Sequence, residues 1–129
     1  MRLLVPIDGS DASERALDHA LDLATAFDAT LQVVHFSNDE TDATELVLEH
    51  AREAIRARDV AGTPQVELID LDIWTDTGVG HAIVNFVEEE GYDHVVMGHH
   101  GSGAVERAIL GSAAETVVRS EAVPVTVVP

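Results

Sequence analysis

The chain has 129 residues, of which 46% are hydrophobic, and it contains no cysteine. This length fits a single domain over residues 1–129 whose core needs no disulfide, and the lack of cysteine excludes thiol catalysis and Cys-ligated metal sites. Acidic residues outnumber basic ones by 24 to 7, every basic residue is arginine, and the net charge is −17. Because nonspecific nucleic-acid binding requires basic side chains, we expect no nucleic-acid partner.

The acidic excess accompanies a hydrophobic content high enough for folding, so it predicts an acidic coat on a folded domain instead of disorder. Salt screens the repulsion within such a coat, with a Debye length of about 3 Å at 1 M. The composition therefore favours a halophilic source, with an ordinary acidic protein as the alternative. No apolar run approaches the roughly 18–20 residues of a membrane span, and no signal-peptide pattern follows Met1. We expect a cytoplasmic protein without a membrane partner.

The chain begins with a strand pattern, a helix pattern and a second strand pattern. The apolar run Leu3–Ile7 predicts a strand buried on both faces. Ser10 or Asp11 then caps a helix whose apolar stripe extends to Phe27. Thr30–Phe36 predicts the next strand.

The middle of the chain continues the alternation. Apolar residues spaced over positions 46–55 predict a second helix, and Val66–Ile73 predicts a third strand. Acidic residues within that strand favour an exposed position at the edge of the sheet. Thr77 is placed to cap a third helix that ends near Gly91.

The last part contains a strand at His94–Met97, a helix at Ser112–Arg119 and a strand at Val125–Val128. Five strands alternating with four helices imply parallel βαβ units and a doubly wound α/β fold. If the strand order is 3-2-1-4-5, the order reverses between the first and fourth strands. Ligands of such folds bind beyond the carboxyl ends of the strands at this reversal.

A glycine motif follows the fourth strand. Gly98-His99-His100-Gly101 leaves the strand, and after nine intervening residues Gly111-Ser112 begins the last helix. Glycines allow the backbone to turn and to approach a ligand closely, and a helix N-terminus attracts anions. A chain without lysine has no Walker A loop, and the turn after the first strand lacks the dinucleotide fingerprint. The motif therefore predicts a different phosphate site.

The histidines give a weaker signal. His99 and His100 are adjacent, and adjacent side chains of an extended segment point in opposite directions, so we expect no metal site here. His35 and His94, near strand ends, are interpreted as hydrogen-bonded polar residues of the core.

The motif and most of the chain resemble the universal stress protein family, in particular its ATP-binding branch. The resemblance includes the opening segment 5–10, the strand end at 33–35, the segment 93–98 before the glycine motif, and the closing segment 123–128. It implies a five-stranded parallel sheet with four helices, of the adenine-nucleotide alpha-hydrolase-like type. It also implies ATP as ligand, with Mg²⁺ or Mn²⁺ bound through the phosphates.

The resemblance suggests a role for each matching position. Asp8 would accept a hydrogen bond from the adenine, and Pro6 and Phe36 would lie against the base. The ribose and phosphate path would be lined by Met97, Gly98, His100 and Gly101. Phosphate oxygens would be held by Gly111, Ser112 and Ala113, with Arg107 neutralising charge.

Two positions depart from the family pattern. The family usually has a smaller aliphatic residue at the position of Phe36. Many relatives carry Gly-x-Pro before the third helix, where this chain has Thr77-Gly78-Val79-Gly80. We expect that helix start to lie far from the phosphates and to matter little for binding.

The leading hypothesis is an ATP-binding stress-response switch with at most weak hydrolysis, because phosphoryl transfer uses several cationic groups and the motif has only Arg107. The alternatives are a slow ATPase or nucleotidyl-transfer enzyme on the same fold, and a structural stress protein without a nucleotide. The apolar last strand, at residues 125–128, predicts a homodimer, because an exposed edge strand pairs readily with a second chain.

Overall fold

The computed structural model describes residues 1–37, 41–58, 65–70, 78–100 and 110–129. Its strands are β1 (Arg2–Ile7), β2 (Thr30–Ser37), β3 (Gln65–Asp70), β4 (His94–Gly98) and β5 (Val125–Val128). Its helices are α1 (Asp11–Phe27), α2 (Asp42–Arg56), α3 (Gly78–Glu90) and α4 (Ser112–Arg119). The predicted α/β class with a parallel sheet and four helices is confirmed. The predicted continuation of β3 to Ile73 and the predicted cap Thr77 lie outside the described residues.

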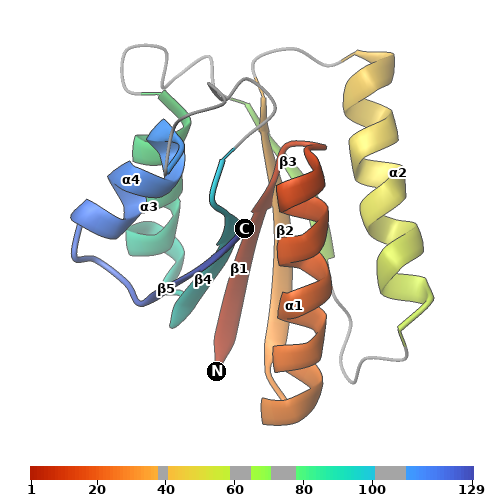
Figure 1. Ribbon diagram of the computed structural model, residues 1–129, viewed down its shortest axis with the longest axis horizontal. Coiled ribbons are helices and arrows are strands. Elements are labelled where there is room, and N and C mark those ends of the chain that lie inside the picture. Colours follow the sequence, from red (N-terminus) through yellow and green to blue (C-terminus); the bar gives the residue numbers. More distant parts are fainter. Residues whose placement is uncertain (38–40, 59–64, 71–77, 101–109) are drawn as a thin grey trace.

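The strands form one parallel sheet in the order β3-β2-β1-β4-β5, with helices on both faces (Figure 1). One apolar cluster joins the sheet to α1 and α2, and includes Leu3, Leu17 and Ala51. The other joins the opposite face to α3 and α4, and includes Ile83 and Val117. The central strand β1 supplies both clusters because alternate residues of a strand point to opposite faces.

Local sequence explains where α1 begins and ends. Ser10 is its N-cap and accepts a hydrogen bond from the Ser13 backbone N–H, and Asp28 ends it in the left-handed conformation at φ 52°. The buried face of α1 follows the predicted spacing with three differences: Ser13 and Leu21 are also buried, whereas Phe27 is 62% exposed. Phe27 is the last residue of the helix.

The registered pairing between β1 and β4 is confined to the amino end of β1. β1 pairs with β2 over its whole length, up to Ile7 opposite His35. With β4 its registered pairs are Leu3 with His94 and Leu4 with Val95, both near the amino end of β1. The carboxyl ends of the two strands are therefore free to face a cavity. In the described part of the chain, every helix is too short or too polar to cross a membrane.

Candidate functional site

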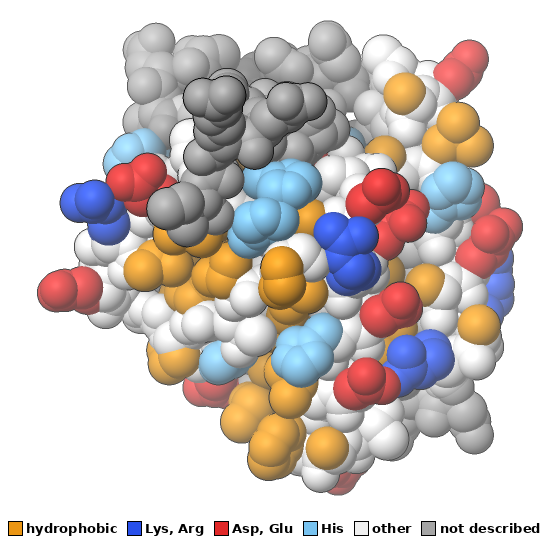
Figure 2. All heavy atoms as spheres, viewed as in Figure 1, with side chains coloured by type: hydrophobic (Ala, Val, Ile, Leu, Met, Phe, Trp, Pro, Cys, Tyr) orange, Lys and Arg blue, Asp and Glu red, His pale blue; other side chains and the backbone are white. Residues whose placement is uncertain are grey.

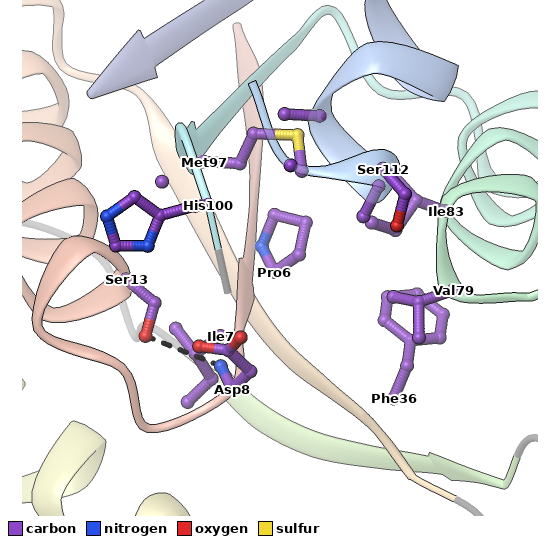
Figure 3. Close-up of a pocket in the computed structure, with 14 residues that line it drawn as sticks. Pro6, Ile7, Asp8, Ser13, Phe36, Val79, Ile83, Met97, His100 and Ser112 are labelled. Atoms are coloured by element: carbon purple, nitrogen blue, oxygen red, sulfur yellow. Dashed lines mark hydrogen bonds between the residues drawn. The ribbon is translucent and has the colours of Figure 1, made fainter. Parts of the chain in front are cut away.

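A cavity of about 340 Å³ lies at the carboxyl ends of β1 and β4 (Figure 3). Its walls come from the β1–α1 turn, the end of β2, the first turns of α3 and α4, and the end of β4. The lining residues are Pro6, Ile7, Asp8, Ser13, Phe36, Val79, Ile83, Met97, Gly98, His100, Gly111, Ser112, Ala113 and Ala114. This volume is within the range of small-molecule sites.

Asp8 is held at one end of the cavity by a network of short-range hydrogen bonds. Its carboxylate oxygen Oδ1 accepts from the Ser10 backbone N–H at 2.9 Å, and its own N–H donates to Ser13 Oγ at 3.4 Å (Figure 3). Ser13 Oγ in turn donates to the Ser10 carbonyl at 3.0 Å. Gly9 makes this tight turn possible with φ 82°, a conformation that other residues rarely adopt. The Asp8 carboxylate therefore has a fixed position just after the carboxyl end of β1.

The amino end of α4 forms another part of the cavity wall. Its N-cap is Gly111, which has no side chain to bond the first N–H groups of the helix. Gly111 is itself fixed, because its N–H donates to the His99 carbonyl at 2.6 Å and its carbonyl accepts from the Glu115 N–H at 2.9 Å. The first N–H groups of a helix have no intrahelical partner and carry partial positive charge. Together with the Ser112 hydroxyl they form a donor set suited to an anion.

The wall between these two regions is mainly apolar. Phe36 is 7% exposed and packs edge-on against Phe86, with ring centroids 5.9 Å apart and an interplanar angle of 86°. Pro6, Met97 and Ile83 complete this surface (Figure 3). An apolar surface with hydrogen-bonding groups at its ends suits a flat ring that carries a polar substituent and an anionic tail.

Two histidines have structural hydrogen bonds, and a third, His100, lies at the cavity. His35 Nδ1 lies 2.8 Å from the Ile7 carbonyl, and His94 Nε2 lies 2.7 Å from Thr126 Oγ1, so both have the hydrogen-bond partners expected of core histidines. Burial lowers the pKa of His94. The rings of His99 and His100 are 3.9 Å apart, and His100 lines the cavity. Within the described residues no three His, Asp or Glu side chains converge as a metal site.

The structure brings together nine of the predicted site residues: Pro6, Asp8, Phe36, Met97, Gly98, His100, Gly111, Ser112 and Ala113. The other two, Gly101 and Arg107, lie outside the described residues. Sequence reasoning missed Ile7, Ser13, Val79, Ile83 and Ala114. The signal for Ser13 was available, because a serine on the apolar face of a helix needs a partner and here finds the turn that carries Asp8.

The sequence predicts that Gly98 lets the backbone turn toward a ligand, but the structure gives this glycine a different role. It belongs to β4 and pairs with Val128. A Cβ at this position would lie 2.9 Å from the Ala12 carbonyl carbon and 3.0 Å from the Ser13 nitrogen. Glycine is thus required because the first turn of α1 packs directly on the strand.

The start of α3 lines the cavity, so the expectation that it lies far from the site is wrong. Val79 lines the same cavity as Ser112 and Ala113. α3 and α4 approach closely at Gly80, where a Cβ would lie 2.6 Å from Thr116 Cβ. This close packing places the first turns of both helices beside one crevice, so the segment before α3 helps to define its shape.

Comparison with known proteins agrees with this architecture. The universal stress protein family matches residues 1–129. The chain belongs to this family. It is 30% identical to a universal stress protein of Methanocaldococcus jannaschii, over 98% of this chain and 81% of that protein.

Two solved structures extend the comparison. A universal stress protein in complex with cAMP has a TM-score of 0.78 and 26% identity, covering 99% of this chain and 95% of that chain. Universal stress protein UspA from Lactobacillus plantarum has a TM-score of 0.75 and 25% identity, covering 100% and 97%. The family and the fold thus agree with those expected from the motif and the strand pattern.

Proposed function

We propose that this universal stress protein binds an adenine nucleotide, ATP, in the cavity between β1 and β4 and acts as a nucleotide-dependent switch in a stress response. The observation that carries the proposal is the pairing of a fixed carboxylate, Asp8, with the uncapped amino end of α4 in one cavity. A carboxylate accepts from the exocyclic amino group of a base, whereas a helix N-terminus binds phosphate. The relative in complex with cAMP supports a nucleotide as ligand.

In the proposed complex the base lies against Pro6 and Phe36 and bonds to Asp8. Met97, Gly98, His100 and Gly101 line the ribose and phosphate path. Gly111, Ser112 and Ala113 donate to phosphate oxygens, and Arg107 neutralises charge. Mg²⁺ or Mn²⁺ would be carried by the phosphates themselves, because oxygen-rich groups are the ligands these ions prefer.

A switch is favoured over an enzyme by the side chains at the cavity. Phosphoryl transfer uses cationic side chains and a group that orients the nucleophile. Among the described lining residues there is no arginine, and the carboxylate of Asp8 is assigned to the base end of the cavity. We therefore expect hydrolysis to be slow. Rapid turnover would instead support the ATPase or nucleotidyl-transfer alternative, and a folded protein that binds no nucleotide would support a structural role.

The decisive experiment places a negative charge at the proposed phosphate end. Ser112→Asp adds a carboxylate to the first turn of α4, where the helix dipole stabilises it by about 0.3–1 kcal/mol. The same carboxylate repels phosphate, so calorimetry at the lowest KCl concentration at which the protein is folded should show ATP affinity reduced at least about tenfold, without loss of thermal stability. Leu46→Asp is the matched control, because Leu46 is 59% exposed on α2 and does not line the cavity. Equal ATP affinity in both variants, or no ATP binding by the unmodified protein, would refute the proposal.

We also propose that two copies associate through β5. This strand lies at one edge of the sheet, pairs with β4 on one side, and its four residues are all half-buried. In the described part of the chain no strand pairs with its outer edge. Antiparallel pairing with a second β5 across a twofold axis would satisfy these backbone groups.

A further inference from the structure

A second cavity, of about 380 Å³, lies between α1 and α2 (Figure 1 shows both helices along one face of the sheet). We call it the α1–α2 groove. Its apolar floor includes Leu17 and Ala51, which are 4% and 3% exposed. It shares Ile7 and Ser13 with the first cavity, so the two cavities are neighbours at the β1–α1 turn.

The rim of the groove is acidic on both sides. Glu14 and Asp18 lie one turn apart on α1, a spacing that places both side chains on one face of the helix. Glu53 lies across the groove on α2. All three side chains are exposed. Three carboxylates therefore lie around the apolar floor of the groove.

The arginines of these helices do not neutralise the rim. Arg52 and Arg56 on α2 both pair with Glu49, with N···O distances of 3.5 and 2.9 Å. Arg15 on α1 donates through Nε to the Pro129 carbonyl at 2.7 Å. Among the described residues, the three rim carboxylates form no ion pair. His50 also lines the groove, so the three carboxylates share it with one imidazole. Acidic side chains are spread over this face of the molecule (Figure 2), and those at the groove leave it with a net negative charge.

We propose that the α1–α2 groove binds a linear aliphatic polyamine. The volume fits a small molecule and is too small for a protein helix, whose diameter with side chains is about 10–12 Å. Methylene segments of a polyamine cover an apolar floor, while ammonium groups reach the carboxylates of both walls. A metal ion would leave the apolar floor unused, and the described residues contain no cluster suited to one.

The test is a titration with spermidine in a fixed concentration of KCl at which the protein is folded. The groove variant carries Glu14→Gln, Asp18→Asn and Glu53→Gln together. The control variant carries Glu88→Gln, Glu89→Gln and Glu90→Gln, which removes the same charge from exposed residues of α3. Loss of three exposed ion pairs predicts about tenfold weaker spermidine binding for the groove variant, and a change of less than about threefold for the control.

Two further readouts separate a specific site from a diffuse counterion atmosphere. Hexaamminecobalt(III) has the same charge as spermidine but no methylene groups, so it should not discriminate between the two variants. Methyl NMR signals of Ile7, Leu17 and Val47, which line the groove, should shift with spermidine in the unmodified protein. Equal weakening of spermidine binding in both variants, or no saturable shift of these methyl signals, would overturn the proposal. Neither readout depends on whether ATP binds.

Discussion

Gly98→Ala tests the close contact between β4 and the first turn of α1. An added Cβ would lie 2.9 Å from both the carbonyl carbon and the Cβ of Ala12, and 3.0 Å from the Ser13 nitrogen. Two of these three atoms belong to the backbone of a helix packed on the sheet, so they cannot move away as the end of a flexible side chain can. The strand and the helix must separate, and the packing around Gly98 must loosen.

The expected cost is that of overpacking a core, about 1–3 kcal/mol. For a domain of this size, a loss of 1 kcal/mol in the free energy of unfolding lowers Tm by about 4 °C. Gly98→Ala should therefore lower Tm by about 4–12 °C. It should also weaken ATP binding, because Ser13 supports the turn that carries Asp8.

Thermal unfolding followed by circular dichroism in constant KCl measures Tm, and urea unfolding measures the free energy of unfolding. Urea is used because guanidinium chloride would also change the screening of a protein with net charge −17. A double variant, Gly98→Ala with Ala12→Gly, removes the contact with Ala12 Cβ but leaves the contacts with the backbone atoms, so it should recover only part of the lost stability. A Gly98→Ala protein as stable as the unmodified one would show that β4 and α1 are not in close contact.

Three further predictions concern pH, salt and assembly. Because burial lowers the pKa of His94, the unfolded chain takes up a proton at a higher pH than the folded one. The free energy of unfolding should therefore fall as the pH drops below about 6.5 and level off once the folded-state pKa is passed, whereas His94→Gln should lack this step; parallel profiles of the two proteins would contradict this. With net charge −17, Tm should rise between about 0.1 and 2 M KCl as repulsion is screened, and a flat profile would argue against a halophilic adaptation. Deletion of residues 125–129 should give a monomer or an unfolded chain by light scattering, whereas an intact dimer would exclude assembly through β5.

The local pattern of the sequence determined the elements and the helix N-terminus that lines the cavity. Spacings of 3.6 and 2 residues reflect the geometry of a single helix or strand, so the alternation that predicts an α/β fold can be recognised without tertiary contacts. Gly111-Ser112 could be assigned in the same way, because the N-terminus of a helix exposes its N–H groups in any context.

Only the tertiary structure decided which segments share a wall. Val79 and Ile83 join the cavity because α3 packs against α4 at Gly80, and Gly98 is required by the approach of Ala12, 86 positions earlier in the chain. Likewise, Phe27 fits the periodicity of α1 but is 62% exposed in the folded chain. Periodicity identifies which face of an element is apolar, whereas the relative placement of distant elements decides how much of that face is covered and what each glycine contacts.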